Sequence, residues 1–184
     1  GVGWLSKRLS ELPHARLIKE RADNWEMGGC APGSYAQIIE LFKYVCWIGS
    51  HFVQTDDQRA LYVEGMNRIA WHERALLAHM LEGTAEIPGV RHIPGVHVIS
   101  DNPDLTQRDL IVALTFDGKR CADVAREYEK RGVIVHERDK SSLYNERQVL
   151  SLGVDGIVRV TPLHCHRIDE IDKFLKITAE IAAL

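Results

Sequence analysis

GIVRVTPLHCHRIDEIDKFL (residues 156–175) is the stretch that says most about the fold of this chain. It opens with an apolar run, 156–162, that is typical of a buried β-strand and ends at a proline. A short polar segment follows, and apolar residues then recur at helical spacing over about 167–182. Asp169 and Glu170 favour a helix N-terminus here, because the helix dipole places partial positive charge at that end. The stretch therefore predicts a strand followed by an amphipathic helix.

Strands and helices also alternate on the N-terminal side of this stretch. Further strands are expected in three segments: 89–101, 109–116 and 133–137. Helices are expected over about 119–131, where Gly132 stops the helix, and over about 144–152. The second half of the chain is therefore expected to be an α/β sandwich, with a small sheet and helices on one face.

The first half of the chain is expected to contain two helices after a glycine-rich loop. The loop ADNWEMGGCAPGS covers 22–34, and its last residue, Ser34, is a candidate N-cap for a helix over about 35–49. A longer helix is expected over about 56–81. Its apolar face is interrupted once, by Glu73.

The composition is that of an ordinary globular protein. Of the 184 residues, 45% are hydrophobic and 27% are charged, so nothing indicates disorder. The net charge of −3 and the absence of a Lys/Arg run argue against a nucleic-acid partner. No apolar run is long enough for a membrane helix, and no signal peptide is recognisable. The four cysteines are scattered, which favours free thiols in a reducing, cytoplasmic compartment.

Arg159 is the one charged residue inside the apolar run 156–162. Because side chains alternate along a strand, Arg159 is expected on the opposite face from Val158 and Val160. A guanidinium in such a place needs an anion, and a carboxylate bound through two hydrogen bonds is its natural match. The residues leave three readings open: a substrate carboxylate, an internal Asp or Glu, or simple exposure on an edge strand.

Two other segments are candidates for chemistry. His164, Cys165 and His166 could contribute to a metal site or supply a nucleophile, although their spacing matches no recognised motif and packing roles are the alternative. In NWEMGGCAPG (24–33), adjacent glycines could let backbone N–H groups approach a phosphate, or the loop could be a plain connector. No dinucleotide-binding, P-loop, nucleophile-elbow or zinc-protease motif is present.

Taken together, the loop and the final strand resemble the class V aminotransferase and cysteine desulfurase-like group of pyridoxal phosphate (PLP) enzymes. Glu26-Met27-Gly28-Gly29 is similar to that group's Glu-x-Gly-Thr loop, and Arg159-Val160-Thr161 is similar to its late Arg-x-Ser strand. The ending of this sequence is close to a subgroup pattern, SPLHCH…DIDRFL. The likeness covers essentially residues 1–184.

The resemblance implies a fold-type I PLP enzyme, of which this chain is the C-terminal portion. Residues 1–33 would end the large cofactor-binding domain, and 34–184 would form the small domain with its linking helices. Arg159 would bind the α-carboxylate of an amino-acid substrate. Glu26, Gly28 and Gly29 would reach the PLP phosphate of the partner subunit in a homodimer, although Gly29 replaces the usual threonine.

The resemblance also implies what this chain does not supply. The lysine that holds PLP would precede Gly1, so no catalytic residue is assigned and the chain alone is expected to be inactive. The intact protein is expected to be an aminotransferase or lyase. Desulfurase chemistry through a loop cysteine is disfavoured, since no cysteine lies between Cys121 and Cys165. The alternative is a stand-alone dimerising or small-molecule-binding domain without catalysis.

Overall fold

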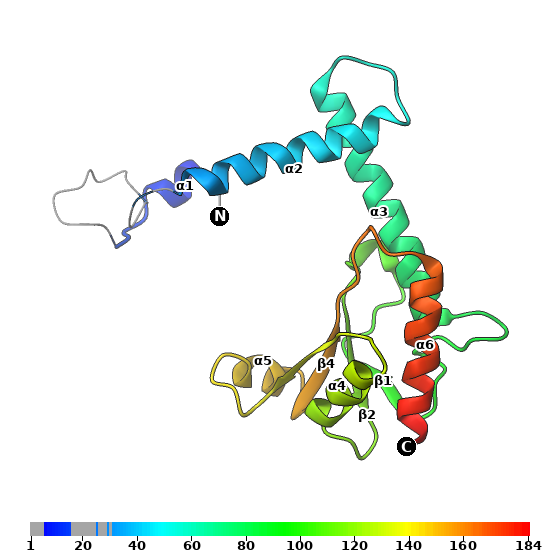
Figure 1. Ribbon diagram of the computed structural model, residues 1–184. Coiled ribbons are helices and arrows are strands. Elements are labelled where there is room, and N and C mark those ends of the chain that lie inside the picture. Colours follow the sequence, from blue (N-terminus) through cyan, green and yellow to red (C-terminus); the bar gives the residue numbers. More distant parts are fainter. Residues whose placement is uncertain (1–5, 16–24, 26–28, 30) are drawn as a thin grey trace. The chain divides into compact units, whose positions relative to one another are not determined.

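The computed structural model describes residues 6–15, 25, 29 and 31–184 of the chain (Figure 1). The chain divides into two compact units, Gly1–Met66 and Asn67–Leu184. The boundary predicted between residues 33 and 34 separates the large and small domains of a complete PLP enzyme, and it stays a prediction.

The first unit is helical. It contains α1 (Lys7–Ser10), α2 (Pro32–Ser50) and the first turns of α3 (Gln58–Glu82), a helix that continues into the second unit. Both predicted long helices are confirmed, but the N-cap prediction for Ser34 is wrong. The cap residue is Ala31, which makes no side-chain cap bond, and the helix begins at Pro32. Proline suits this position because its fixed φ is already helical and its missing N–H is not needed there.

Two glycines allow α2 and the start of α3 to touch backbone to backbone. A Cβ on Gly49 would lie 2.0 Å from the carbonyl oxygen of Leu61, and one on Gly65 would lie 2.0 Å from that of Val45. Cys46 also donates to the Gln58 carbonyl at 3.5 Å. Only residues without side chains fit at Gly49 and Gly65, so this crossing depends on them.

The second unit is built on a four-stranded antiparallel sheet with the order β1-β2-β4-β3. The strands are β1 (Val96–Val98), β2 (Val112–Phe116), β3 (His136–Asp139) and β4 (Gly156–Val160). The helical elements are the 3₁₀ turn η1 (Leu105–Gln107), α4 (Cys121–Lys130), α5 (Glu146–Ser151) and α6 (Ile168–Ala183). The prediction for β3 is off by about three residues, because the strand forms only where residues 136–139 find partners on β4.

The main core lies between one face of this sheet and the helices α3, α4 and α6. The strands contribute Val112, Leu114 and Val158, all fully buried. Tyr128 of α4 stacks on Phe174 of α6 with ring centroids 5.6 Å apart. The predicted class, an α/β fold with a small sheet and helices packed on one face, is confirmed.

Histidines on α3 attach the end of the chain to this helix. The Nε2 atom of His79 lies 2.6 Å from a carboxylate oxygen of Asp172 in α6, and both side chains are half-buried. The Nε2 atom of His72 lies 2.9 Å from the backbone oxygen of His166.

None of the helices in the described part of the chain has the length and apolar character needed to cross a membrane.

Candidate functional site

Arg159 lies near the C-terminal end of β4, a strand with neighbours on both sides. Its cross-strand partners are Ala113 on β2 and His136 on β3. Val158 and Val160 on either side of it are buried in the main core. The predicted alternation is therefore confirmed: Arg159 is on the sheet face opposite to the one that packs on α4 and α6. It is half-buried, and it is not on an edge strand.

No carboxylate in the described part of the chain pairs with the Arg159 guanidinium, and its Nε atom is buried without a hydrogen-bond partner. A buried donor left in this state costs about 1–3 kcal/mol. Arg74 also has a buried Nε without a partner. Its charge, however, acts on the carboxylate of Asp104. The pKa of Asp104 is lowered mainly by hydrogen bonds from Thr106 and to a smaller extent by the charge of Arg74. Arg159 is therefore a half-buried cation with free hydrogen-bonding capacity.

Two other half-buried arginines of the second unit, Arg91 and Arg108, have acidic partners. Arg91 forms ion pairs with Asp101 and Glu82, and Asp101 also pairs with Arg108 at 2.6 Å. Hydrogen bonds from Arg91 hold the pKa of Asp101 below its ordinary range. The chain thus satisfies these guanidiniums internally, in contrast to Arg159.

The His164–His166 segment is bound to the protein itself. The Nδ1 atom of His166 accepts a hydrogen bond from the backbone N–H of Leu163 at 3.0 Å. Nδ1 of His164 lies 3.8 Å from a carboxylate oxygen of Glu73. This contact explains the interruption in the apolar face of α3. No group of three or more metal-binding side chains forms within the described residues, so the metal hypothesis gains no support.

The structure describes only one of the three residues predicted to approach PLP. Glu26 and Gly28 lie outside the described residues. Gly29 is exposed, and a Cβ added to it would meet no atom within 4 Å. The described residues therefore build no closed cradle for a phosphate around Gly29, and the fit of PLP to this loop stays a prediction.

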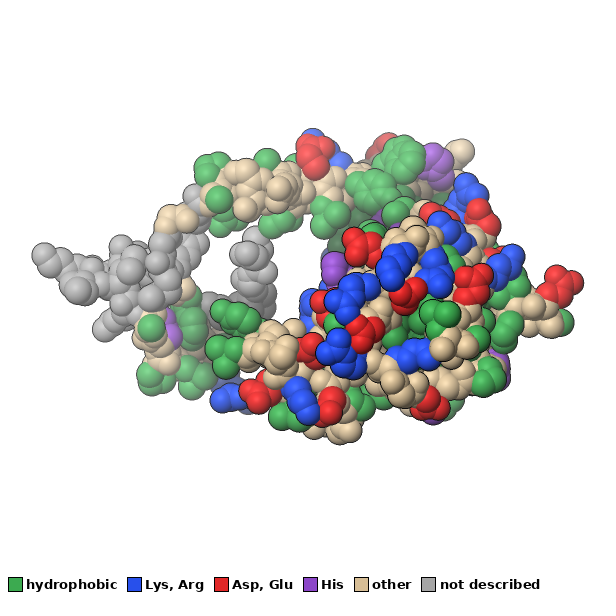
Figure 2. Space-filling model, turned by 60° about the horizontal axis from the view of Figure 1, so that its bottom comes forward, with side chains coloured by type: hydrophobic (Ala, Val, Ile, Leu, Met, Phe, Trp, Pro, Cys, Tyr) green, Lys and Arg blue, Asp and Glu red, His purple; other side chains and the backbone are tan. Residues whose placement is uncertain are grey.

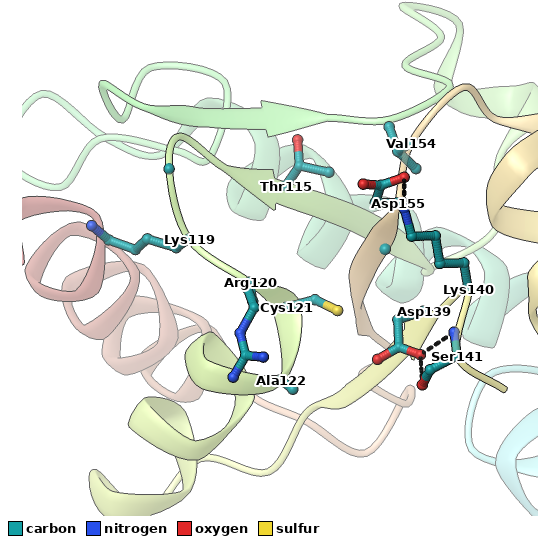
Figure 3. Close-up of a pocket in the computed structure, with 12 residues that line it drawn as sticks. Thr115, Lys119, Arg120, Cys121, Ala122, Asp139, Lys140, Ser141, Val154 and Asp155 are labelled. Atoms are coloured by element: carbon teal, nitrogen blue, oxygen red, sulfur yellow. Dashed lines mark hydrogen bonds and ion pairs between the residues drawn. The ribbon is translucent and has the colours of Figure 1, made fainter.

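A cavity of about 620 Å³ lies at the other end of β4, between the β2–α4 turn and the loop after β3 (Figure 3). Its lining includes Thr115, Cys121, Asp139, Lys140 and Asp155, but not Arg159. Lys140 and Asp155 form an ion pair at 2.8 Å, and Asp139 accepts a hydrogen bond from the backbone N–H of Ser141 at 2.9 Å.

Cys121 directs its sulfur into this cavity (Figure 3). Burial raises the pKa of its thiol, which disfavours the thiolate that a nucleophile requires. Sequence reasoning did not find the cavity, because its walls come from three segments far apart in the chain. No local pattern marks them.

No protein-family model matches this sequence, and no curated protein matches it. Among solved structures, the chain is similar to a cysteine desulfurase from Thermococcus onnurineus NA1, with a TM-score of 0.52 and 21% identity over 68% of this chain. It is also similar to the cysteine desulfurase CsdA from Escherichia coli (TM-score 0.49, 14% identity, 72% of this chain and 32% of that chain). A NifS-like protein gives a TM-score of 0.45 at 17% identity, over 71% of this chain and 35% of that chain.

These similarities concern the fold, and they extend over only part of the length of each solved protein. The chain spans about 29% of the Thermococcus protein, whose sequence identity to it is low. The fold of this chain therefore matches the C-terminal portion of the cysteine desulfurase fold.

Proposed function

We propose that this chain is the substrate-binding C-terminal portion of a PLP-dependent enzyme that acts on an amino acid, as an aminotransferase or a lyase. Arg159 binds the substrate α-carboxylate. The observation that carries the proposal is the half-buried guanidinium of Arg159, which has no acidic partner in the described part of the chain.

The chemistry of an arginine in this position suits a carboxylate. Its guanidinium is charged at every physiological pH and presents its N–H donors in a planar fork that matches the two oxygens of a carboxylate. Because β4 is held between β2 and β3, the base of the side chain is fixed by the sheet. A substrate carboxylate would accept hydrogen bonds from the terminal Nη donors of the guanidinium, because the Nε atom is buried.

The proposal divides the work between this chain and the rest of the enzyme. PLP supplies the electron sink for amino-acid chemistry when it is bound. The residues of this chain bind and orient the substrate through Arg159. A cysteine-based sulfur transfer is not part of the proposal, because the β3–β4 connection contains no cysteine and burial keeps the Cys121 thiol protonated.

Exposed apolar side chains support the view that the chain belongs to a larger assembly. On α2, Leu41 is 62% exposed and Trp47 is 58% exposed, and Ile39 and Tyr44 are exposed as well. A helix that is apolar on most sides is usually buried in the complete molecule. The homodimer implied by the family resemblance stays a prediction.

The test compares ligands that differ only in the carboxylate. Calorimetry on the full-length protein would measure the affinity for alanine and for alaninamide, whose carboxyl group is replaced by a neutral amide. Arg159→Gln should weaken alanine binding by about 10- to 100-fold, as expected for a lost charge-assisted hydrogen bond, and leave alaninamide binding unchanged. Arg147→Gln, at an exposed position on α5, is the matched control. Equal alanine affinity in wild type and Arg159→Gln would refute the proposal.

A further inference from the structure

We infer that the substrate carries a second carboxylate, as aspartate and glutamate do, and that Arg138 of β3 binds it. This inference rests on the proposed function of Arg159, which it deepens by naming the class of amino acid.

Strand register places the two arginines on the same face of the sheet. In the β3–β4 ladder, Arg159 is opposite His136 and Arg138 is opposite Ile157. Opposed residues in an antiparallel pair share a face, and residues two apart on one strand share it as well. Arg138 and Arg159 are therefore diagonal neighbours, with Cα atoms about 7–8 Å apart in such pairs, a separation that long side chains can bridge through a ligand.

Arg138 resembles Arg159 in its electrostatic state. It is half-buried, one Nη donates to the backbone oxygen of Glu137 at 2.9 Å, and no carboxylate within the described residues forms an ion pair with it. The Glu137 side chain is on the other face, because it is opposite the core residue Val158. Two guanidiniums without acids thus share one sheet face with His136. Mutual repulsion between such cations is relieved when anions bind between them.

The two arginines lie on a packed part of this sheet face. Ile157 lies opposite Arg138 and is 4% exposed, so the protein already covers its side chain and gives the two arginines a packed base. Two planar forks on separate strands match two separate carboxylates better than one compact anion. On the side of the second unit that Figure 2 shows, Lys and Arg are interspersed with Asp and Glu, so that side presents no continuous basic surface to a polyanion.

The experiment measures a ratio of affinities. Calorimetry on the full-length protein would give dissociation constants for aspartate, glutamate and alanine. Wild type should bind at least one of the two dicarboxylates about 10-fold or more tightly than alanine, since a charge-assisted bond adds at least that much. Arg138→Gln should remove this preference and change alanine affinity by less than about twofold. Arg138→Lys, which keeps the charge, should retain part of the preference, and Arg147→Gln should retain all of it.

The outcomes separate the two proposals. If Arg138→Gln leaves the ratio of dicarboxylate to alanine affinity unchanged, or if wild type shows no preference, the second carboxylate site is refuted while the role of Arg159 stands. If Arg159→Gln leaves alanine binding intact, the proposed function itself fails. Circular dichroism of each variant would establish that a lost preference comes from a folded protein.

Discussion

Replacing Thr178 by valine should destabilise the second unit through a single unsatisfied hydroxyl on a neighbouring helix. Thr178 and Tyr128 are both fully buried, and their side-chain oxygens are 2.6 Å apart. Thr178 donates its only hydroxyl proton to the Phe174 backbone oxygen at 2.7 Å. The Tyr128 hydroxyl must therefore donate to Thr178 Oγ1. Burial raises the pKa of Tyr128, so this phenol remains a proton donor at every relevant pH.

The expected size of the effect follows from that geometry. Valine has nearly the shape of threonine, so Thr178→Val leaves packing intact but leaves the Tyr128 donor without a partner, at a cost of about 1–3 kcal/mol. Tyr128→Phe removes the donor instead and should cost about 1 kcal/mol, because Thr178 keeps its bond to Phe174. In the double variant the unsatisfied donor is gone. The cost of the double variant should therefore fall short of the sum of the two single-variant costs by about 1 kcal/mol.

Hydrogen exchange of the β4 and α6 amides would measure these free energies inside the second unit, without assuming that both units unfold together. Thr115→Val is the matched control. It makes the same chemical change at a half-exposed position on the opposite sheet face, and its effect should add to that of Tyr128→Phe. Simple additivity of Thr178→Val and Tyr128→Phe would refute the hydrogen-bond direction given above.

Three further predictions follow from the structure. Gly65→Ala should speed hydrogen exchange in α2, because the new methyl group would clash with the Val45 carbonyl at a cost of about 1–3 kcal/mol, which exceeds the gain in helix propensity. Gly33→Ala is the control and should not speed exchange, because a Cβ there meets nothing within 4 Å. The pKa of Asp101 is lowered in the folded state, so the stability that Asp101 provides is complete above its unfolded-state pKa and is lost as pH falls through its folded-state pKa. Asp101→Asn should therefore flatten the acid side of a profile of unfolding free energy against pH. Iodoacetamide should modify exposed Cys165 before Cys121, whose pKa is raised by burial; faster labelling of Cys121 in peptide mapping would contradict this.

Local sequence patterns were sufficient to place most of the elements. Apolar residues at helical spacing located α2, α3 and α6 to within a few residues, because a helix buries one face and the pattern records which side chains it buries. Alternation in GIVRV placed Arg159 on the face opposite its neighbouring valines, and the structure confirms this. Such features depend on residues close together in the chain, so the chain itself encodes them.

The partners of those elements were decided only by the tertiary structure. The order β1-β2-β4-β3 could not be predicted, because the periodicity of a strand does not specify which strand lies beside it. Pairing with β4 moved β3 to His136–Asp139, and this register sets His136 opposite Arg159 and Arg138 diagonal to it. The sequence likewise could not predict that no acid among the described residues pairs with Arg159, because hydrogen-bond and ion-pair partners come from segments distant in the chain. Sequence alone thus determined which way Arg159 points, and the packed sheet determined what lies next to it.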